Sequence, residues 1–154
     1  MSRLFNDLFI FEIANSHQGD VEHGKDIIHE MGKIARKYNI NAAVKLQYRN
    51  LDNFIHPDYV NRTDVPHVPR FMSTRLTYDQ FTELVDAIKE EEMIAISTPF
   101  DEGSVDWCME QGIDIIKISF IISFHTENVI LHFYIVLLNI RHRQTICSLI
   151  LLTA

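Results

Sequence analysis

The sequence predicts an α/β fold in which parallel strands alternate with helices. Four short apolar runs fit strands, and the segments between them carry apolar residues at the three- and four-residue steps of a helix. Strands that are apolar throughout are buried on both faces, and such strands form parallel sheets joined by helical crossovers. The chain has 154 residues, 47% of them hydrophobic and 23% charged, so it can bury a core without a disulfide.

The first strand is expected at residues 8–14 (LFIFEIA), ahead of the polar cluster NSHQ. Asp20 fits the N-cap of the helix that follows, and Asn39 fits the left-handed residue that ends it. The buried face of this helix is expected to carry six apolar residues: Ile27, Ile28, Met31, Ile34, Ala35 and Tyr38. The second strand is expected at residues 42–48 (AAVKLQY).

A long connection with three prolines precedes the next helix, and loops of this length are often functional. Thr77 and Gln80 have the spacing of a capping box, which predicts where that helix begins. Its end, the run EEE at 90–92, is expected to be solvated. Four residues form its apolar stripe: Phe81, Leu84, Val85 and Ile88.

The third and fourth strands are expected at residues 93–98 (MIAIST) and 113–119 (IDIIKIS). Asp101 fits the N-cap of the helix between them, and Gly112 ends it. Three residues are expected to face the core from this helix: Val105, Cys108 and Met109.

Composition changes once along the chain, near residue 119. All glycines and prolines lie before it, and residues 120–154 contain no Gly, Pro, Asp or Lys, so they can form few turns. Their most apolar stretch, 129–140, is shorter than the ~20 residues of a membrane helix. We therefore expect residues 1–119 to form the domain. We expect 120–154 to be an apolar tail, either a buried strand or helix or a truncated or misread end.

Charge and cysteine usage exclude several classes of protein. The 14 Lys and Arg against 21 Asp and Glu give a net charge of −7, which argues against a nucleic-acid partner. Asp7 and Glu12 lie in or beside the N-terminal apolar run, which is therefore not a signal peptide. Cys108 and Cys147 lie far apart, as is usual in a reducing compartment. We expect a cytoplasmic protein that contacts no membrane.

Polar residues lie near the C-terminal end of each predicted strand, which is where parallel α/β folds bind their ligands. Two lysines within buried strands each need an anion. Glu12 can pair with one of them, so the other is expected to take a phosphate or carboxylate group of a ligand. The alternative is that both lysines reach solvent and pair with acids. The residues concerned are Glu12, Lys45 with Gln47, Ser97 with Thr98, and Lys117 with Ser119.

Four motifs now carry a resemblance: FEIANSHQGD, AAVKLQY, STPFDEGSVDW and GIDIIKIS, in this order. Together they resemble the N-terminal half of the sialic acid synthase family, which comprises N-acetylneuraminate synthase and related nonulosonic acid synthases. The resemblance covers about residues 8–119 and implies a partial TIM (β/α)₈-type barrel with about four β/α units and parallel strands. It also implies an enzyme that condenses phosphoenolpyruvate with an N-acylated amino sugar such as N-acetylmannosamine.

The resemblance assigns roles residue by residue. Lys45, Thr98 and Lys117 would contact the phosphate and carboxylate of phosphoenolpyruvate, and Glu12 would lie by the sugar and the attacking centre. The implied catalytic residues are Glu12, Lys45 and Lys117, and the implied substrate-binding residues are Gln47, Thr98, Ser97 and His17.

The resemblance further implies a divalent metal, Mn or Mg, and a homodimer. The metal ligands of the family come from later strands, so they are not expected in this chain, and its histidines show no HExxH spacing. The chain by itself is expected to be an inactive fragment. Two other interpretations stay open. One is a non-catalytic half-barrel that binds a phosphorylated sugar or a partner, and the other is a different α/β phosphate enzyme such as an aldolase relative.

Overall fold

Four parallel strands in the order β1-β2-β3-β4 form the sheet of this protein, as seen in a computed structural model that describes residues 5–117. The predicted tail, 120–154, and Ser119 lie outside the described residues. The strands are β1 (Phe9–Ala14), β2 (Ala42–Tyr48), β3 (Ile94–Pro99) and β4 (Ile115–Ile116). Three longer helices connect them: α1 (Val21–Tyr38), α4 (Tyr78–Glu90) and α5 (Glu102–Glu110).

The predicted helix ends are confirmed by their capping contacts. The Asp20 carboxylate accepts hydrogen bonds from two backbone N–H groups of the first turn of α1, and Asn39 ends that helix with φ 51°. Both halves of the capping box are present at α4, where Thr77 and Gln80 satisfy each other's backbone N–H. Asp101 accepts a hydrogen bond from the Ser104 N–H at the start of α5. Local sequence therefore sets where these helices begin.

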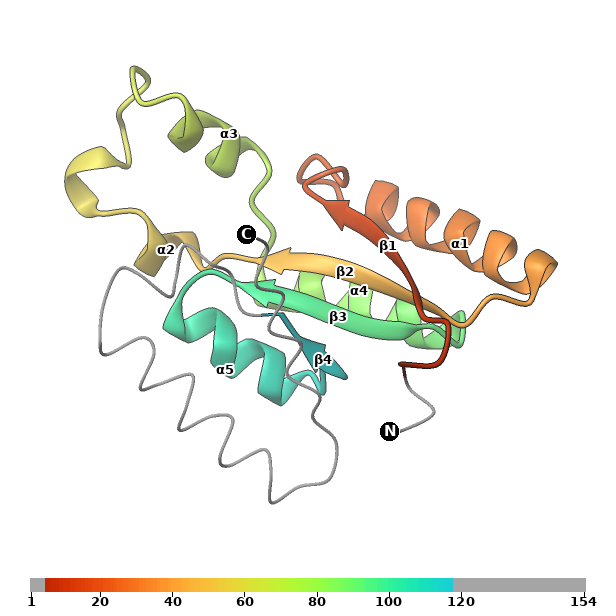
Figure 1. The fold of residues 1–154 in the computed structure, drawn as a ribbon. Coiled ribbons are helices and arrows are strands. Elements are labelled where there is room, and N and C mark those ends of the chain that lie inside the picture. The colour runs from red at the N-terminus through yellow and green to blue at the C-terminus, as the bar shows by residue number, and fades with distance from the viewer. Residues whose placement is uncertain (1–4, 118–154) are drawn as a thin grey trace, which may run out of the picture.

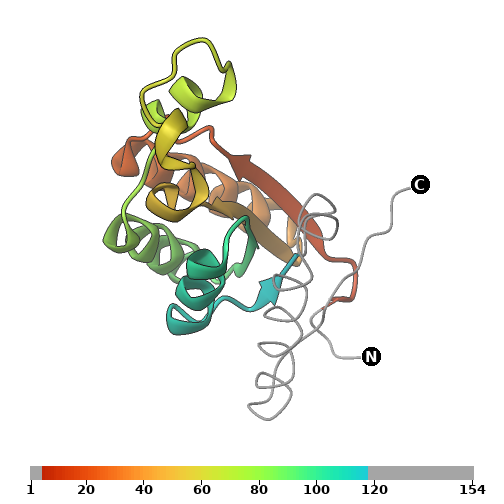
Figure 2. The same cartoon turned by 90° about the vertical axis from the view of Figure 1, so that its left-hand side faces the viewer.

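The three long helices cover one face of the sheet (Figures 1 and 2). The main core lies between them and the strands, and it includes the predicted α4 stripe together with Val44, Leu46 and Val105. The opposite face, called the inner face below, has a smaller apolar cluster of Ala43, Ile96 and Ile115. Among the described helices, none combines the length and apolar character that crossing a membrane requires.

Several predicted positions differ in detail. The third strand is shifted by one residue to 94–99, and the fourth is described only at 115–116 instead of 113–119. On α1, Ile34 and Tyr38 are exposed, whereas Gly24 and Gly32 are buried against α4. The periodic apolar pattern did not predict these buried glycines, because they are buried by the close approach of α4 and the residue after it. Met109 on α5 is also exposed.

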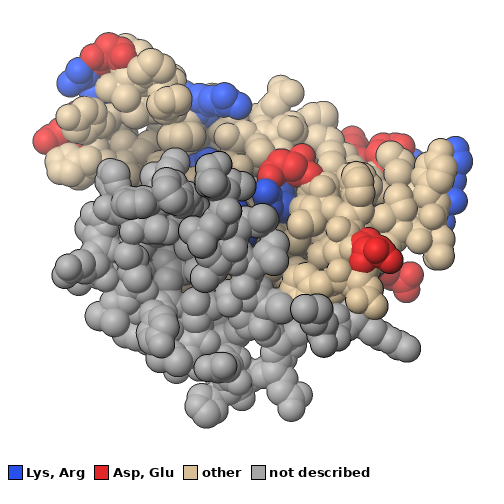
Figure 3. Space-filling view, in the orientation of Figure 1, with Lys and Arg blue, Asp and Glu red and all other residues tan. Residues whose placement is uncertain are grey.

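The chain leaves the sheet between β2 and α4 and forms a separate excursion, residues 50–77. It contains α2 (Leu51–Phe54), the short 3₁₀ helix η2 (Pro57–Tyr59) and α3 (His67–Ser73). Leu51, Ile55 and Val68 form its own small apolar cluster. The excursion lies beyond the carboxyl ends of β1 to β3 (Figure 1), and charged side chains gather on its outer surface (Figure 3). It therefore lies on the side of the sheet where ligands are expected.

Glu91, just after α4, contradicts the expectation of a solvated acidic run. Its side chain is only 13% exposed and accepts a hydrogen bond from His29 Nδ1 at 2.8 Å, while Arg36 pairs with its other oxygen. Both partners lie on α1, so this carboxylate joins the two helices.

Candidate functional site

The first polar layer of the inner face is formed by Glu12 and Lys45. The two residues are direct neighbours across β1 and β2, and their side chains form an ion pair. The Lys45 side chain is 22% exposed and the Glu12 side chain 43%, so water reaches the pair without surrounding it. Lys45 also lies beside Ile96 of β3. The pair therefore neutralises a lysine that the apolar inner face alone would not accommodate.

A β-bulge follows Glu12 in β1. Glu12 pairs with Lys45 and Ala14 pairs with Leu46, so Ile13 is the extra residue. Ala14 has the left-handed φ of 44°, which is costly for a residue with a side chain. Bulges are common beside functional sites because they redirect the strand and its neighbouring side chains. Here the bulge lies between Glu12 and the loop 15–20 that follows β1.

The second polar layer, one step nearer the carboxyl ends, contains Gln47, Thr98 and Lys117. Gln47 and Thr98 are neighbours across β2 and β3, and Thr98 is 3% exposed. The Lys117 N–H donates to the Ser97 carbonyl at 2.8 Å, which extends the β3–β4 ladder to the level of Thr98. Within residues 5–117, no carboxylate lies within ion-pair distance of the Lys117 ammonium. Within the described residues, Lys45 is thus paired with a carboxylate and Lys117 is not.

A hollow of about 320 Å³ opens on this face and contains both lysines in its wall. The remainder of its described lining is apolar: Phe5, Leu8, Ile10, Ile96 and Ile115. Two ammonium groups at the edge of an apolar hollow favour an anionic ligand over a neutral one, because a low-dielectric wall strengthens the electrostatic attraction. This hollow is the candidate site.

Ser97 is placed away from the hollow. It is fully buried and alternates with Ile96 and Thr98 along β3, so its side chain lies on the helix-facing side of the sheet. Cys108 of α5 lies beside it: burial raises the pKa of the Cys108 thiol, and the nearby Ser97 hydroxyl acts in the opposite direction. The structure therefore does not bring the Ser97 side chain together with Lys45 and Lys117.

His17 lies in the loop after β1 and is 2% exposed. Its Nδ1 accepts a hydrogen bond from the Gly19 N–H at 3.1 Å, so the proton of the neutral ring is on Nε2. Burial lowers the pKa of His17, and the charges of Arg49 and His23 lower it further. Gly19 has φ 81°, and a Cβ there would lie 2.7 Å from the Ser73 carbonyl, which places this loop tightly against the end of α3.

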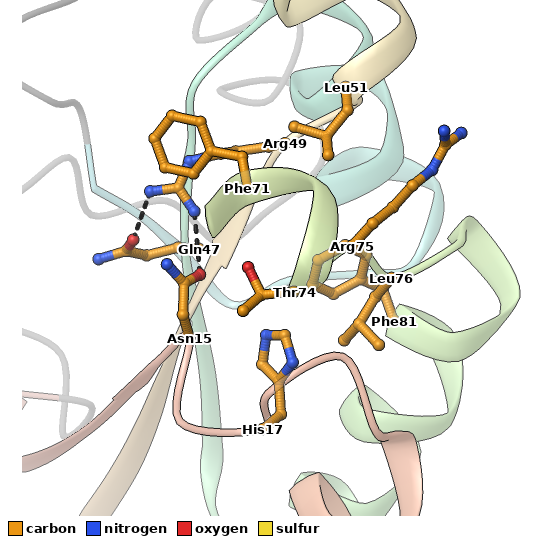
Figure 4. Close-up of a pocket in the computed structure, with 10 residues that line it drawn as sticks. All are labelled: Asn15, His17, Gln47, Arg49, Leu51, Phe71, Thr74, Arg75, Leu76 and Phe81. Atoms are coloured by element: carbon orange, nitrogen blue, oxygen red, sulfur yellow. Dashed lines mark hydrogen bonds between the residues drawn. The ribbon is translucent and has the colours of Figure 1, made fainter. Parts of the chain in front are cut away.

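Arg49 is a site residue that the sequence reasoning did not identify. The rings of Phe71 and Phe100 both pack against its guanidinium. The guanidinium donates hydrogen bonds to the side chains of Asn15 and Gln47 (Figure 4). A small cavity of about 10 Å³, enough for roughly one water molecule, lies between these residues and His17. The sequence feature that could have indicated Arg49 is its position: it is a cation directly after a buried strand and two residues beyond Gln47.

Asp101 fixes the end of β2 to the start of α5. Its carboxylate accepts hydrogen bonds from the Asn50 N–H at 2.8 Å and from the Ser104 hydroxyl at 2.6 Å. Burial raises the pKa of Asp101, and these hydrogen bonds, with Arg49 nearby, act in the opposite direction. The residue after Arg49 is therefore held by the cap of the neighbouring helix.

A metal is not accommodated by the part of the chain that is described. Within residues 5–117, no three His, Cys, Asp or Glu side chains come close enough to share a metal ion.

Comparison with known proteins gives a consistent result. Residues 33–133 match the NeuB family. A protein from Chromobacterium violaceum described as spore coat polysaccharide biosynthesis protein E shares 44% identity over 83% of this chain, with a TM-score of 0.77. An N-acetylneuraminic acid (sialic acid) synthetase from Leptospira borgpetersenii, solved with citrate, shares the fold at 21% identity over 73% of this chain, with a TM-score of 0.53.

The chain spans 38% of the length of the first protein and 35% of the second. A search of curated proteins gave no significant match. The predicted fold class is confirmed: the four parallel strands and their helices are part of a barrel of the (β/α)₈ type.

Proposed function

Because the chain belongs to the NeuB family, we propose that it is part of a synthase that condenses phosphoenolpyruvate with an N-acylated amino sugar, such as N-acetylmannosamine, to form a nonulosonic acid. The names of the two similar structures, one in polysaccharide biosynthesis and one a sialic acid synthetase, support this class of reaction. The chain covers less than half of either protein, so the activity is proposed for a whole enzyme of which these residues form part of the site.

The observation that carries the proposal is the unequal state of the two lysines. Glu12 neutralises Lys45, whereas Lys117 has no carboxylate partner within the described residues, and both line the same hollow. Phosphoenolpyruvate carries a phosphate and a carboxylate, so it supplies the missing anion for Lys117 and a further acceptor for Lys45. Thr98 and Gln47 lie in the same layer as Lys117, one step beyond Lys45, where a hydroxyl and an amide can add hydrogen bonds.

The proposed reaction uses these groups at defined points. The enol carbon of phosphoenolpyruvate attacks the sugar aldehyde, and positive charge develops on the carbon that bears the phosphate. Water adds to that carbon and loses a proton, the former aldehyde oxygen takes up a proton to become a hydroxyl, and the carbon–oxygen bond to phosphate breaks so that phosphate leaves and a keto group remains. Lys45 and Lys117 stabilise the phosphate and carboxylate throughout, and fixed cations are most effective where negative charge accumulates on the leaving group. The Glu12 carboxylate stabilises the cationic carbon or accepts a proton from the attacking water.

Titration of phosphoenolpyruvate into the chain by calorimetry tests the proposal. The parent chain is compared with Lys117→Met and Lys45→Met, which keep the apolar stem and remove the charge. The control is Lys33→Met, because Lys33 is 63% exposed and pairs with Glu30 on the outside of α1.

We expect Lys117→Met to lose most of the binding, since a charge-assisted contact contributes about 1.5–3 kcal/mol. Lys45→Met is expected to lose less, because its ammonium is already engaged by Glu12. Lys33→Met should bind like the parent. Equal affinity of all four proteins would refute the anion site and would favour the interpretation that both lysines have a structural role.

A further inference from the structure

Arg49 is a partly buried cation that forms no ion pair with a carboxylate in the described residues. Its guanidinium carbon lies 4.7 Å from the ring centre of Phe71 and 4.3 Å from that of Phe100, so two aromatic rings pack against it. Its Nε is buried and has no hydrogen-bond partner. Burial lowers the pKa of Arg49. Only the two terminal nitrogens, Nη1 and Nη2, make polar contacts to the described side chains.

Those two contacts go to side-chain amides from different segments. Nη1 donates to Asn15 Oδ1 at 3.1 Å, and Nη2 donates to Gln47 Oε1 at 2.7 Å. Asn15 lies in the loop after β1 and Gln47 in β2, so the guanidinium bridges two neighbouring strand ends. A lysine ammonium could not reproduce this arrangement, since it lacks the rigid planar fork that holds two acceptors at once.

The chemistry of arginine then fixes the orientation of both amides. A guanidinium has only donors, so each amide must place its carbonyl oxygen on Arg49, which leaves its NH₂ group to donate elsewhere. Figure 4 shows both hydrogen bonds ending on the amide oxygens, with the nitrogen of Gln47 pointing away from the guanidinium and that of Asn15 beside its oxygen. Neither NH₂ group donates a hydrogen bond within residues 5–117. Two oriented donors are thus presented at the carboxyl ends of β1 and β2, next to the inner-face layer of Thr98 and Lys117.

We propose that Arg49 is a positioning residue that orients the Asn15 and Gln47 amides so that both NH₂ groups donate to an acceptor oxygen of the ligand. The choice of ligand rests on the proposed function, and the shared chemistry is a carboxylate, hydroxyl or acyl oxygen of either phosphoenolpyruvate or the N-acylated sugar. The Phe71 and Phe100 rings pack against the guanidinium, so the excursion contributes to the site through Phe71.

The first test reads the amides directly. The side-chain NH₂ signals of Asn15 and Gln47 are followed by nitrogen-15 NMR in the full chain and in Arg49→Lys, which keeps the charge and loses the fork. Arg62→Lys is the control, because Arg62 pairs with Asp64 at the exposed tip of the excursion. We expect both NH₂ signals to move toward the values of free amides in Arg49→Lys and to stay unchanged in Arg62→Lys. Unchanged signals in Arg49→Lys, with the backbone spectrum intact, would overturn the proposal.

The second test separates positioning from structural support. Gln47→Glu keeps an oxygen toward Arg49, and so keeps the bridge, while it replaces the NH₂ donor by an acceptor. Phosphoenolpyruvate and N-acetylmannosamine are titrated separately, because the sugar is neutral and is not repelled by the added charge. We expect Arg49→Lys and Gln47→Glu each to lower the affinity for at least one of the two ligands by about tenfold. Arg62→Lys should leave the affinity for both ligands unchanged.

If Gln47→Glu stays folded and binds both ligands as the parent does, Arg49 only supports the fold and the proposal is wrong. If the parent chain binds neither ligand while the NH₂ signals respond to Arg49→Lys, the proposed function fails for this chain and the orienting role of Arg49 stands.

Discussion

Replacement of Glu12 by glutamine is expected to strengthen the binding of phosphoenolpyruvate. In the structure the Glu12 carboxylate forms an ion pair with the Lys45 ammonium, so an incoming anion must compete with Glu12 for Lys45. Glutamine has nearly the same shape and can still accept a hydrogen bond from Lys45, but it carries no charge. The substitution therefore frees part of the Lys45 charge for the ligand and removes a repulsion between two anions.

The size of the effect follows from the exposure of the pair. Because Glu12 is 43% exposed and Lys45 22%, water screens their attraction, and we take the upper end of the range for exposed pairs, about 1 kcal/mol. That energy corresponds to an affinity for phosphoenolpyruvate about fivefold higher in Glu12→Gln. The gain should shrink as salt is added, since screening weakens the free Lys45 charge as well.

Calorimetry at low and high salt checks this expectation, with Glu12→Gln/Lys45→Met as the matched control. The double variant should lose the gain, because the freed charge is then absent. N-Acetylmannosamine is the second control ligand, since a neutral sugar gains nothing from an unpaired lysine. An affinity of Glu12→Gln for phosphoenolpyruvate equal to or below that of the parent would refute the reasoning. It would mean that Glu12 does not compete with the ligand for Lys45.

Two further predictions concern stability. Gly32→Ala should gain about 1 kcal/mol of helix propensity, but its Cβ would displace the Glu91 carboxylate from His29 and Arg36. We therefore expect Gly32→Ala to leave the free energy of unfolding unchanged or to lower it in the parent, and to raise it by about 1 kcal/mol in a Glu91→Ala background. The same change in both backgrounds, measured by urea unfolding, would contradict this. Because the pKa of His17 is lowered from 6.5, the unfolded chain binds its proton first as pH falls. The free energy of unfolding should thus decline below about pH 6.5, by at most about 1.4 kcal/mol per unit, and His17→Asn should decline less.

Several local features could be predicted because each depends on a few neighbouring residues. The Asp20 and Thr77 caps satisfy backbone N–H groups within one helical turn, so their residue type and spacing are sufficient signals. The alternation of side chains along β2 likewise predicted that Lys45 and Gln47 share a face, and they are the two partly exposed positions of that strand. The same rule separates Ser97 from Thr98, but a shared motif had grouped the two residues as substrate contacts.

The buried faces of the helices were predicted less well. The periodic pattern of α1 named Ile34 and Tyr38, yet the structure exposes both and buries Gly24 and Gly32. Small residues give no hydrophobic signal, although they are what lets two helices approach closely. Glu91 was expected in solvent because its partners, His29 and Arg36, lie on another helix and cannot be identified from the acidic run itself.

The sequence by itself determined the class of fold, the helix ends and the two lysines at the strand ends, because these follow from local hydrogen bonding and from period. Only the tertiary structure decided which lysine Glu12 neutralises, since that depends on the register between β1 and β2. It alone packed Arg49 against Phe71 and Phe100, which come from separate segments of the chain. The physical reason is that strand register and ring stacking bring together residues that are far apart in sequence. Such contacts produce no periodic pattern within any one segment, so they cannot be predicted from it.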